Sequence, residues 1–161
     1  VFPGFQGGPH DHVTAAMAVS FWEAGQPSYR SYVQQIVANA RALAEGILER
    51  GFRLVTGGTD NHLLLLDLTT QAISGREAEA LLDRIGLTAN KNTIPNDPRS
   101  PLDPSGLRLG TPAITTRGMR EPEVRQIAEW IAAAIAHRDD EEKLHSLRED
   151  VRALARAFPP P

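Results

Sequence analysis

The sequence has 161 residues and a formal net charge of −3, with 41% hydrophobic and 23% charged residues. These values predict one globular domain and give no indication of nucleic-acid binding. The chain has no cysteine, which excludes disulfides and thiolate metal sites and suits a cytoplasmic location. No apolar run approaches the roughly 20 residues that span a bilayer, and no secretory signal is visible.

The chain opens on an apolar, glycine-rich stretch, VFPGFQGGPHDH. Val1 is not a natural first residue, and Phe2 and Phe5 have no upstream segment that could bury them. We therefore expect that an N-terminal region is missing.

Two segments with helical spacing follow. HDHVTAAMAVSFWEA predicts a helix that ends before Gly25, with Pro9 in its first turn. Pro27 begins a longer helix with one apolar face, which Gly51 ends. We expect these first helices to pack against whatever precedes the chain.

Two strands come next. FRLVT is short and rich in β-formers, and HLLLLDL, residues 62–68, is an almost continuous apolar run. Such a run predicts a strand that is buried on both faces. The intervening GGTDN is typical of a turn, so an antiparallel pair is expected.

The remaining elements complete a small sheet. Ser74 and Glu77 have capping-box spacing and predict a helix through Ile85 that Gly86 closes. LTANKN predicts a third strand, and residues 93–107, with four prolines, predict a long loop. LRLGTPAITTRG is then expected to be extended up to a turn, before two final helices. The order predicts an α/β (α+β) fold, a small antiparallel sheet covered by helices.

The glycine pair Gly7-Gly8 precedes the first predicted helix. Glycines in this place let backbone N–H groups approach an anion, and the N-terminus of the helix adds partial positive charge. A tight turn that needs positive φ is the alternative, and two glycines alone favour it.

A single arginine, Arg108, lies between two leucines in SGLRLGTPA. Its apolar neighbours predict a partly buried guanidinium, and a buried charge needs a partner. Arginine can hold a carboxylate or phosphate through two parallel hydrogen bonds. An internal salt bridge is equally compatible with the sequence.

Other polar clusters give weaker signals. NKNTIPND contains three asparagines, which could form hydrogen bonds with a heteroaromatic ring or an amide of a ligand. A strand end followed by an Asx-turn is a simpler explanation of the same residues. Lys91 could form a Schiff base, but nothing around it predicts a desolvated pocket. His10 and His12 would face different directions on a helix, so no metal site is predicted.

Four long motifs occur together in one order: VFPGFQGGPHDH, GGTDNHLLLLDL, NKNTIPNDPRSP and SGLRLGTPAITTRG. In this order and spacing they resemble the C-terminal part of serine hydroxymethyltransferase. The resemblance runs from Val1 to Phe158-Pro159. It implies the aspartate-aminotransferase-like fold, with residues 1–26 ending the cofactor-binding large domain and residues 27–161 forming the C-terminal small domain.

The resemblance also implies an activity. Enzymes of this family use pyridoxal phosphate to move the hydroxymethyl carbon of serine onto tetrahydrofolate, which gives glycine and methylenetetrahydrofolate. It implies a cytoplasmic transferase of one-carbon metabolism and glycine biosynthesis, which forms a homodimer or tetramer through its large domain.

Site residues follow from the same resemblance. Arg108 corresponds to the arginine that holds the substrate carboxylate, and Gly7 and Gly8 to glycines that contact the cofactor phosphate of the neighbouring subunit. Five positions correspond to the folate site: Phe2 (across the dimer), Asn92, Ser100, Pro101 and Leu102. Leu102 replaces a phenylalanine that is common there.

The family's Schiff-base lysine has no counterpart here, and neither do its pyridine-pairing aspartate, ring-stacking histidine and proton-handling glutamate. All four are expected upstream of Val1. Lys91 matches a different family position, so no catalytic residue is assigned and the chain alone is expected to be inactive.

Two alternatives remain. The first is another pyridoxal-phosphate enzyme of this fold that acts on 2-methylserine or threonine, which would share Arg108 but not a folate contact at Asn92. The second is a non-catalytic interaction module without exposed apolar surface, against which Phe2, Phe5 and the long predicted loop argue.

Overall fold

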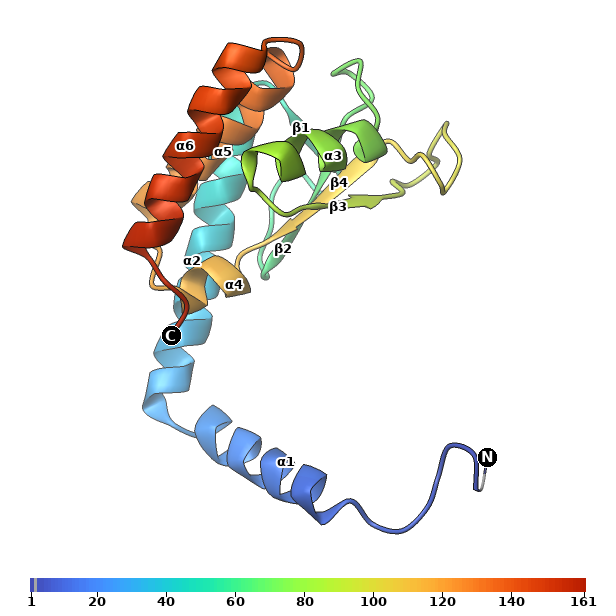
Figure 1. Ribbon diagram of the computed structural model, residues 1–161, viewed down its shortest axis with the longest axis vertical. Helices are drawn as coiled ribbons and strands as arrows, with labels where there is room; N and C mark the ends of the chain where they lie inside the picture. Colours follow the sequence, from blue (N-terminus) through green and yellow to red (C-terminus); the bar gives the residue numbers. More distant parts are fainter. Residues whose placement is uncertain (2) are drawn as a thin grey trace. The chain divides into compact units, whose positions relative to one another are not determined.

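The computed structural model describes residues 1 and 3–161 (Figure 1). The predicted role of Phe2 therefore lies outside the described residues. The chain divides into two compact units, residues 1–34 and residues 35–161, and each is described by itself. The assignment of residues 1–26 to a large domain and 27–161 to a small one stays a prediction.

The first unit contains helix α1 (Asp11–Ala24) and the beginning of helix α2 (Pro27–Glu49). Helix α1 ends before Gly25, as predicted. The expectation that Pro9 lies in its first turn is wrong, because the carbonyl of His10 accepts the first helical hydrogen bond, from Thr14 N at 3.1 Å. None of the residues of α1 is buried.

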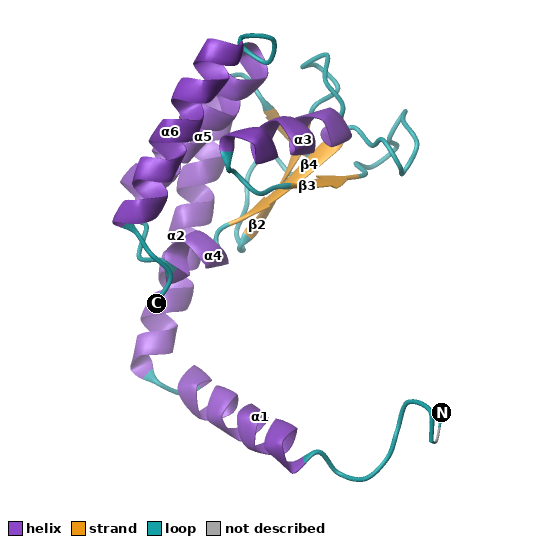
Figure 2. Cartoon of the chain, viewed as in Figure 1, coloured by secondary structure: helices purple, strands orange, loops and turns teal. Residues whose placement is uncertain are grey.

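The second unit is built on a four-stranded antiparallel sheet with the order β1-β2-β4-β3 (Figure 2). The strands are β1 (Arg53–Leu54), β2 (Leu63–Asp67), β3 (Asn90–Asn92) and β4 (Gly106–Gly110). Because β1 and β2 pair antiparallel, the predicted pair of strands is confirmed. Strand β4 lies between β2 and β3, so it is central in the sheet.

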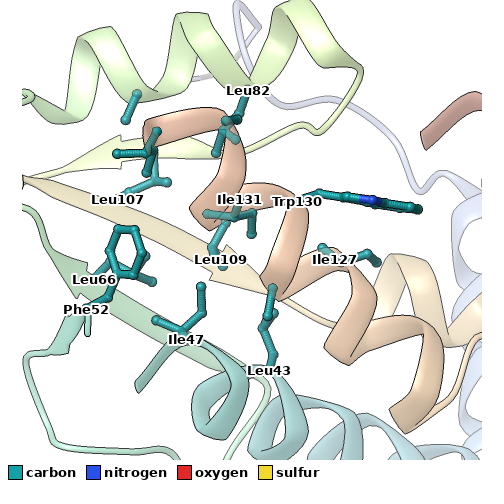
Figure 3. Close-up of a cluster of buried hydrophobic side chains, with 14 of the residues drawn as sticks. Leu43, Ile47, Phe52, Leu66, Leu82, Leu107, Leu109, Ile127, Trp130 and Ile131 are labelled. Atoms are coloured by element: carbon teal, nitrogen blue, oxygen red, sulfur yellow. The ribbon is translucent and has the colours of Figure 1, made fainter. Parts of the chain in front are cut away.

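One face of the sheet forms the core. Leu64, Leu66, Leu107 and Leu109 alternate along β2 and β4 and are buried. Figure 3 shows Leu66, Leu107 and Leu109 packed with apolar side chains of the covering helices. These helices contribute Leu43 and Ile47 of α2, Leu82 of α3 (Gly75–Ile85), and Ile127, Trp130 and Ile131 of α5 (Glu121–Ala136).

The prediction that residues 62–68 are buried on both faces is wrong. Leu63 is 38% exposed and Leu65 is half-buried, whereas Leu64 and Leu66 are buried. Successive side chains of a strand point to opposite faces, and the burial pattern of β2 shows that only one of its faces is fully covered. The open face holds the candidate site.

Helix α3 (Gly75–Ile85) begins and ends as predicted. The Ser74 hydroxyl accepts a hydrogen bond from Glu77 N at 3.1 Å, and the Glu77 carboxylate accepts one from Ser74 N at 2.8 Å. Gly86 closes the helix with φ +86°, in the left-handed region that glycine adopts without strain.

The segment after β4 differs from the prediction. It was expected to be extended up to a turn, but it forms helix α4 (Pro112–Thr116). The Thr111 hydroxyl donates to Ile36 O of α2 at 2.8 Å, and Pro112 occupies the first helical turn, where its missing N–H costs nothing. The two final helices are confirmed as α5 (Glu121–Ala136) and α6 (Glu141–Ala157).

These elements confirm the predicted class, an α/β unit with a small antiparallel sheet covered by helices. Residues 93–105 form the long loop between β3 and β4, although β4 begins at Gly106, inside the range predicted for the loop. No helix of the described residues combines the length and the apolar character that crossing a membrane requires.

Candidate functional site

A cleft of about 630 Å³ lies on the open side of the sheet, within the second unit. One wall is the turn between β1 and β2, and the floor is formed by parts of β2, β3 and β4. Its lining residues are Thr56, Gly57, Gly58, Thr59, Asp60, Asn61, Leu63, Leu64, Leu65, Asn92 and Arg108. The structure therefore brings together Arg108 and Asn92, two of the residues that the sequence singled out.

Arg108 lies at the centre of the floor, opposite Leu65 of β2 and Asn90 of β3. Its neighbours on the same face of β4 are Gly106 and Gly110, so Arg108 provides the single side chain of β4 on this face. Gly106 is required, because a Cβ there would lie 2.5 Å from Asn92 O. At Gly110 an added Cβ would lie 3.2 Å from Leu63 Cδ2.

Arg108 is exposed, so the prediction of a partly buried guanidinium is wrong. Its leucine neighbours, Leu107 and Leu109, point to the other face and are buried there, which explains the error. With the residues that the structure describes, Arg108 forms no ion pair or hydrogen bond, so the internal salt bridge is not found either. The guanidinium stands in the cleft with its donors free.

The facing turn is held by its own side chains. Thr59 Oγ1 donates to Leu63 O at 2.6 Å, and Asn61 Oδ1 accepts from Leu63 N at 2.8 Å. Gly57 has φ +70°, which explains a glycine there. The Asp60 carboxylate has no partner among residues 1 and 3–161. Sequence reasoning identified this turn but not its place beside Arg108, which depends on strand pairing.

Asn92 lies at the end of β3 and lines the cleft. Its amide nitrogen donates to Thr93 O at 2.7 Å, which leaves its amide oxygen available as an acceptor. Ser100, Pro101 and Leu102 lie in the loop 93–105 and do not line this cleft; Leu102 is 81% exposed.

The loop is organised by Asp97, a residue that sequence reasoning did not select. Its carboxylate accepts hydrogen bonds from Ile94 N, Arg99 N, Ser105 N and Ser105 Oγ. Partial burial raises the pKa of Asp97, but these hydrogen bonds lower it more, and the net pKa is about 2. A carboxylate that accepts from several backbone N–H groups is ionised at all ordinary pH values.

Lys91 is engaged away from the cleft. Its Nζ lies 2.8 Å from Glu79 Oε2, and its backbone N–H donates to the same carboxylate at 3.2 Å. These two hydrogen bonds lower the pKa of Glu79. Lys91 therefore has an acidic partner and does not line the cleft that contains Arg108.

Gly7 and Gly8 belong to the first unit and are exposed. Neither has a positive φ, so the alternative of a left-handed tight turn is wrong. No atom of the described chain lies within 4 Å of where a Cβ would stand on either glycine. Their backbone is thus open to the close approach of another group.

The expectation that His10 and His12 face different directions on a helix is wrong, because His10 precedes the first turn of α1 and the two rings are in contact. The rings of His10 and His12 meet edge to face with centroids 5.7 Å apart. In the part of the chain that the structure describes, no group of three or more His, Asp or Glu side chains could hold an ion.

The fold and the cleft define a class: an α/β unit that presents a free guanidinium on the open face of a sheet, an arrangement suited to a small carboxylate or phosphate. The family model for serine hydroxymethyltransferase matches residues 1–131. The chain belongs to the serine hydroxymethyltransferase family.

Named relatives agree with this family. The chain is 55% identical to the serine hydroxymethyltransferase of Acidothermus cellulolyticus over its whole length, and this covers 39% of that protein. It is 52% identical to that of Sorangium cellulosum over its whole length, covering 38%. It is 54% identical to that of Acidobacterium capsulatum over 99% of the chain, covering 37%. The chain thus spans less than two fifths of these relatives, in agreement with the predicted C-terminal portion.

Proposed function

We propose that this chain supplies the substrate-carboxylate site of a pyridoxal-phosphate-dependent serine hydroxymethyltransferase. The complete enzyme would convert serine and tetrahydrofolate into glycine, methylenetetrahydrofolate and water, and would catalyse the reverse reaction. The observation that carries the proposal is Arg108, an unpaired guanidinium in a cleft on the open face of the sheet.

Arg108 would bind the carboxylate of serine or glycine through two parallel N–H···O hydrogen bonds. Its strand holds it in place, because β4 is paired on both sides and the flanking leucines are anchored in the core. A substrate held at a fixed strand position keeps its Cα in one orientation, which is a positioning contribution to catalysis. Asn92, at the edge of the same cleft, would bind the folate ring through its free amide oxygen.

The exposed backbone of Gly7 and Gly8 fits the role that the family implies, a contact with the cofactor phosphate of a neighbouring subunit. Glycines without a nearby atom allow a phosphate to approach the N–H groups of the main chain. Pyridoxal phosphate, when bound, supplies an electron sink for cleavage of a bond at the substrate Cα. The complete enzyme would accordingly be a homodimer or a tetramer.

The chain alone would be inactive. Lys91 is paired with Glu79, and no lysine of the described chain lines the cleft, so the amine that holds the cofactor would come from the rest of the enzyme. The location we propose is the cytoplasm, and the metabolic role is glycine formation and one-carbon supply. Phe2, Ser100, Pro101 and Leu102 complete the proposed folate site.

The test is Arg108→Ala in the complete polypeptide that contains this chain. Loss of a charged, bidentate contact should lower kcat/KM for serine by roughly 30- to 1,000-fold, which corresponds to about 2–4 kcal/mol. Arg148→Ala is the matched control, since Arg148 is exposed on α6 and lies away from the cleft. Near-normal turnover of the Arg108 variant would contradict the role. Turnover of serine without dependence on tetrahydrofolate would favour a different enzyme of the same fold.

A further inference from the structure

The loop between β3 and β4, residues 93–105, is closed by one carboxylate. Asp97 Oδ2 accepts from Ile94 N at 3.2 Å and from Ser105 N at 2.9 Å. Asp97 Oδ1 accepts from Arg99 N at 2.9 Å and from Ser105 Oγ at 2.7 Å. One side chain thus joins the beginning of the loop to its end, and both of its oxygens are fully used.

A turn directly before Asp97 orients its carboxylate. Pro95 and Asn96 form a turn in which Asp97 N donates to Ile94 O at 3.1 Å. Asn96 has φ +54°, a conformation that asparagine tolerates better than most residues. The turn reverses the chain, so the Asp97 side chain faces back across the loop.

The far end of the loop is fixed to the core. Ser105 is 1% exposed, and its carbonyl accepts from Leu68 N at 2.9 Å. The carbonyl of Pro104 accepts from Gly75 N, at the start of α3, at 2.7 Å. Asp97 therefore ties the loop to a buried anchor at Ser105.

The middle of the loop is exposed by comparison. Ser100 and Leu102 are exposed, and the local contacts are Asp103 N to Ser100 O at 3.0 Å and an exposed Arg99–Asp103 ion pair at 3.2 Å. An exposed ion pair of this kind contributes little to stability. The position of Ser100 to Leu102 thus depends on how the ends of the loop are held.

We propose that Asp97 is a positioning residue for tetrahydrofolate, which holds Ile94 and Ser105 together and so fixes the segment Ser100–Leu102. The inference rests on the proposed function, since it requires that this segment contact the folate. Asp97 itself would touch neither substrate. It would act by fixing the position of the loop.

The binding of serine at Arg108 should not depend on Asp97. Arg108 is held by its pairing with Leu65 and Asn90, and Leu107 beside it is fully buried. These contacts do not involve the loop. The loss of Asp97 is therefore expected to affect the two substrates differently, which general damage to the fold would not do.

Asp97→Asn in the complete enzyme tests this. An amide has one acceptor oxygen, so its NH₂ group must replace an oxygen that now accepts two hydrogen bonds. The KM for tetrahydrofolate is expected to rise roughly tenfold or more, while the KM for serine stays within about twofold. Ser105→Ala removes only the hydroxyl contact, and its expected rise in the tetrahydrofolate KM is roughly two- to fivefold. Asp103→Asn is the matched control and should change neither KM.

The outcomes are distinct. A selective rise in the tetrahydrofolate KM supports the inference, and if Asp97→Asn does not fold, the selective rise in Ser105→Ala decides. An unchanged tetrahydrofolate KM in the Asp97 and Ser105 variants, or equal rises for both substrates, overturns the inference alone. A wild-type enzyme that does not respond to tetrahydrofolate overturns the proposed function together with it.

Discussion

The buried amide of Asn39 should contribute strongly to the stability of the second unit. Asn39 is fully buried in α2, and its Nδ2 donates to Thr115 Oγ1 at 2.8 Å and to Met119 O at 3.0 Å. Its Oδ1 accepts from Gln35 Nε2 at 3.0 Å. One amide thus joins α2 to α4 and to the chain that follows α4, the segment that comes directly after the strand of Arg108.

Asn39→Ala removes all three hydrogen bonds. The Thr115 hydroxyl still donates to Thr111 O at 2.8 Å, so it keeps one hydrogen bond. Most of the loss in folding free energy therefore comes from the Met119 carbonyl, which loses its Asn39 donor inside the protein. A buried group that loses its partner costs about 1–3 kcal/mol, and the small cavity adds to this. We expect the free energy of unfolding to fall by roughly 3 kcal/mol, and the urea midpoint to fall by about 1–2 M.

The assay is urea unfolding followed by circular dichroism, with Gln34→Ala as the control. Gln34 is exposed on the same helix, five positions before Asn39, and its replacement should change the free energy of unfolding by less than about 0.5 kcal/mol. If Asn39→Ala is as stable as the control, the buried amide does not join these elements and the reasoning is refuted.

Two further changes test other contacts of the same unit. Gly75→Ala would place a Cβ 2.1 Å from Gly106 O, a backbone atom of the sheet. It should lower the free energy of unfolding, measured by denaturant titration, by roughly 2–3 kcal/mol. In the control Gly58→Ala no atom lies within 4 Å of the added Cβ, so the free energy of unfolding should stay nearly unchanged. Because the folded pKa of Asp97 is depressed from 3.8 to about 2, its carboxylate stabilises the fold above pH 4, and this contribution is lost as the pH falls through 2. The free energy of unfolding of the wild type should therefore approach that of Asp97→Asn between pH 4 and 2, by about 1–2 kcal/mol once solvent screening is allowed for. A difference between the two proteins that stays constant over this pH range would contradict the assigned hydrogen bonds.

Features that depend on neighbouring residues could be predicted from the sequence. The capping box of Ser74 and Glu77 needs only a three-residue spacing, and it is present in the structure. The helices α5 and α6 follow from their apolar periodicity. Arg108 was identified because one arginine among apolar residues is unusual, and the structure places it in a cleft.

Features that depend on distant residues could not be predicted in this way. Helix α4 is supported by the hydrogen bond between Thr111 and Ile36, which are 75 positions apart, whereas its own sequence contains β-branched residues. The run of leucines in β2 does not reveal which face is covered, since the covering helices come from elsewhere in the chain. The exposure of Arg108 could have been inferred, because Leu107 and Leu109 must point to the opposite face of a strand.

The central claim is that the Arg108 guanidinium binds the carboxylate of the amino-acid substrate. The most direct measurement compares glycine with glycinamide, which lacks the negative charge, as ligands of the complete enzyme and of its Arg108→Ala variant. The wild-type enzyme should bind glycine more tightly than glycinamide by roughly 30-fold or more, and the variant should lose most of this preference, because alanine provides neither the positive charge nor the planar pair of donors. Equal preference for glycine in both proteins would contradict the claim.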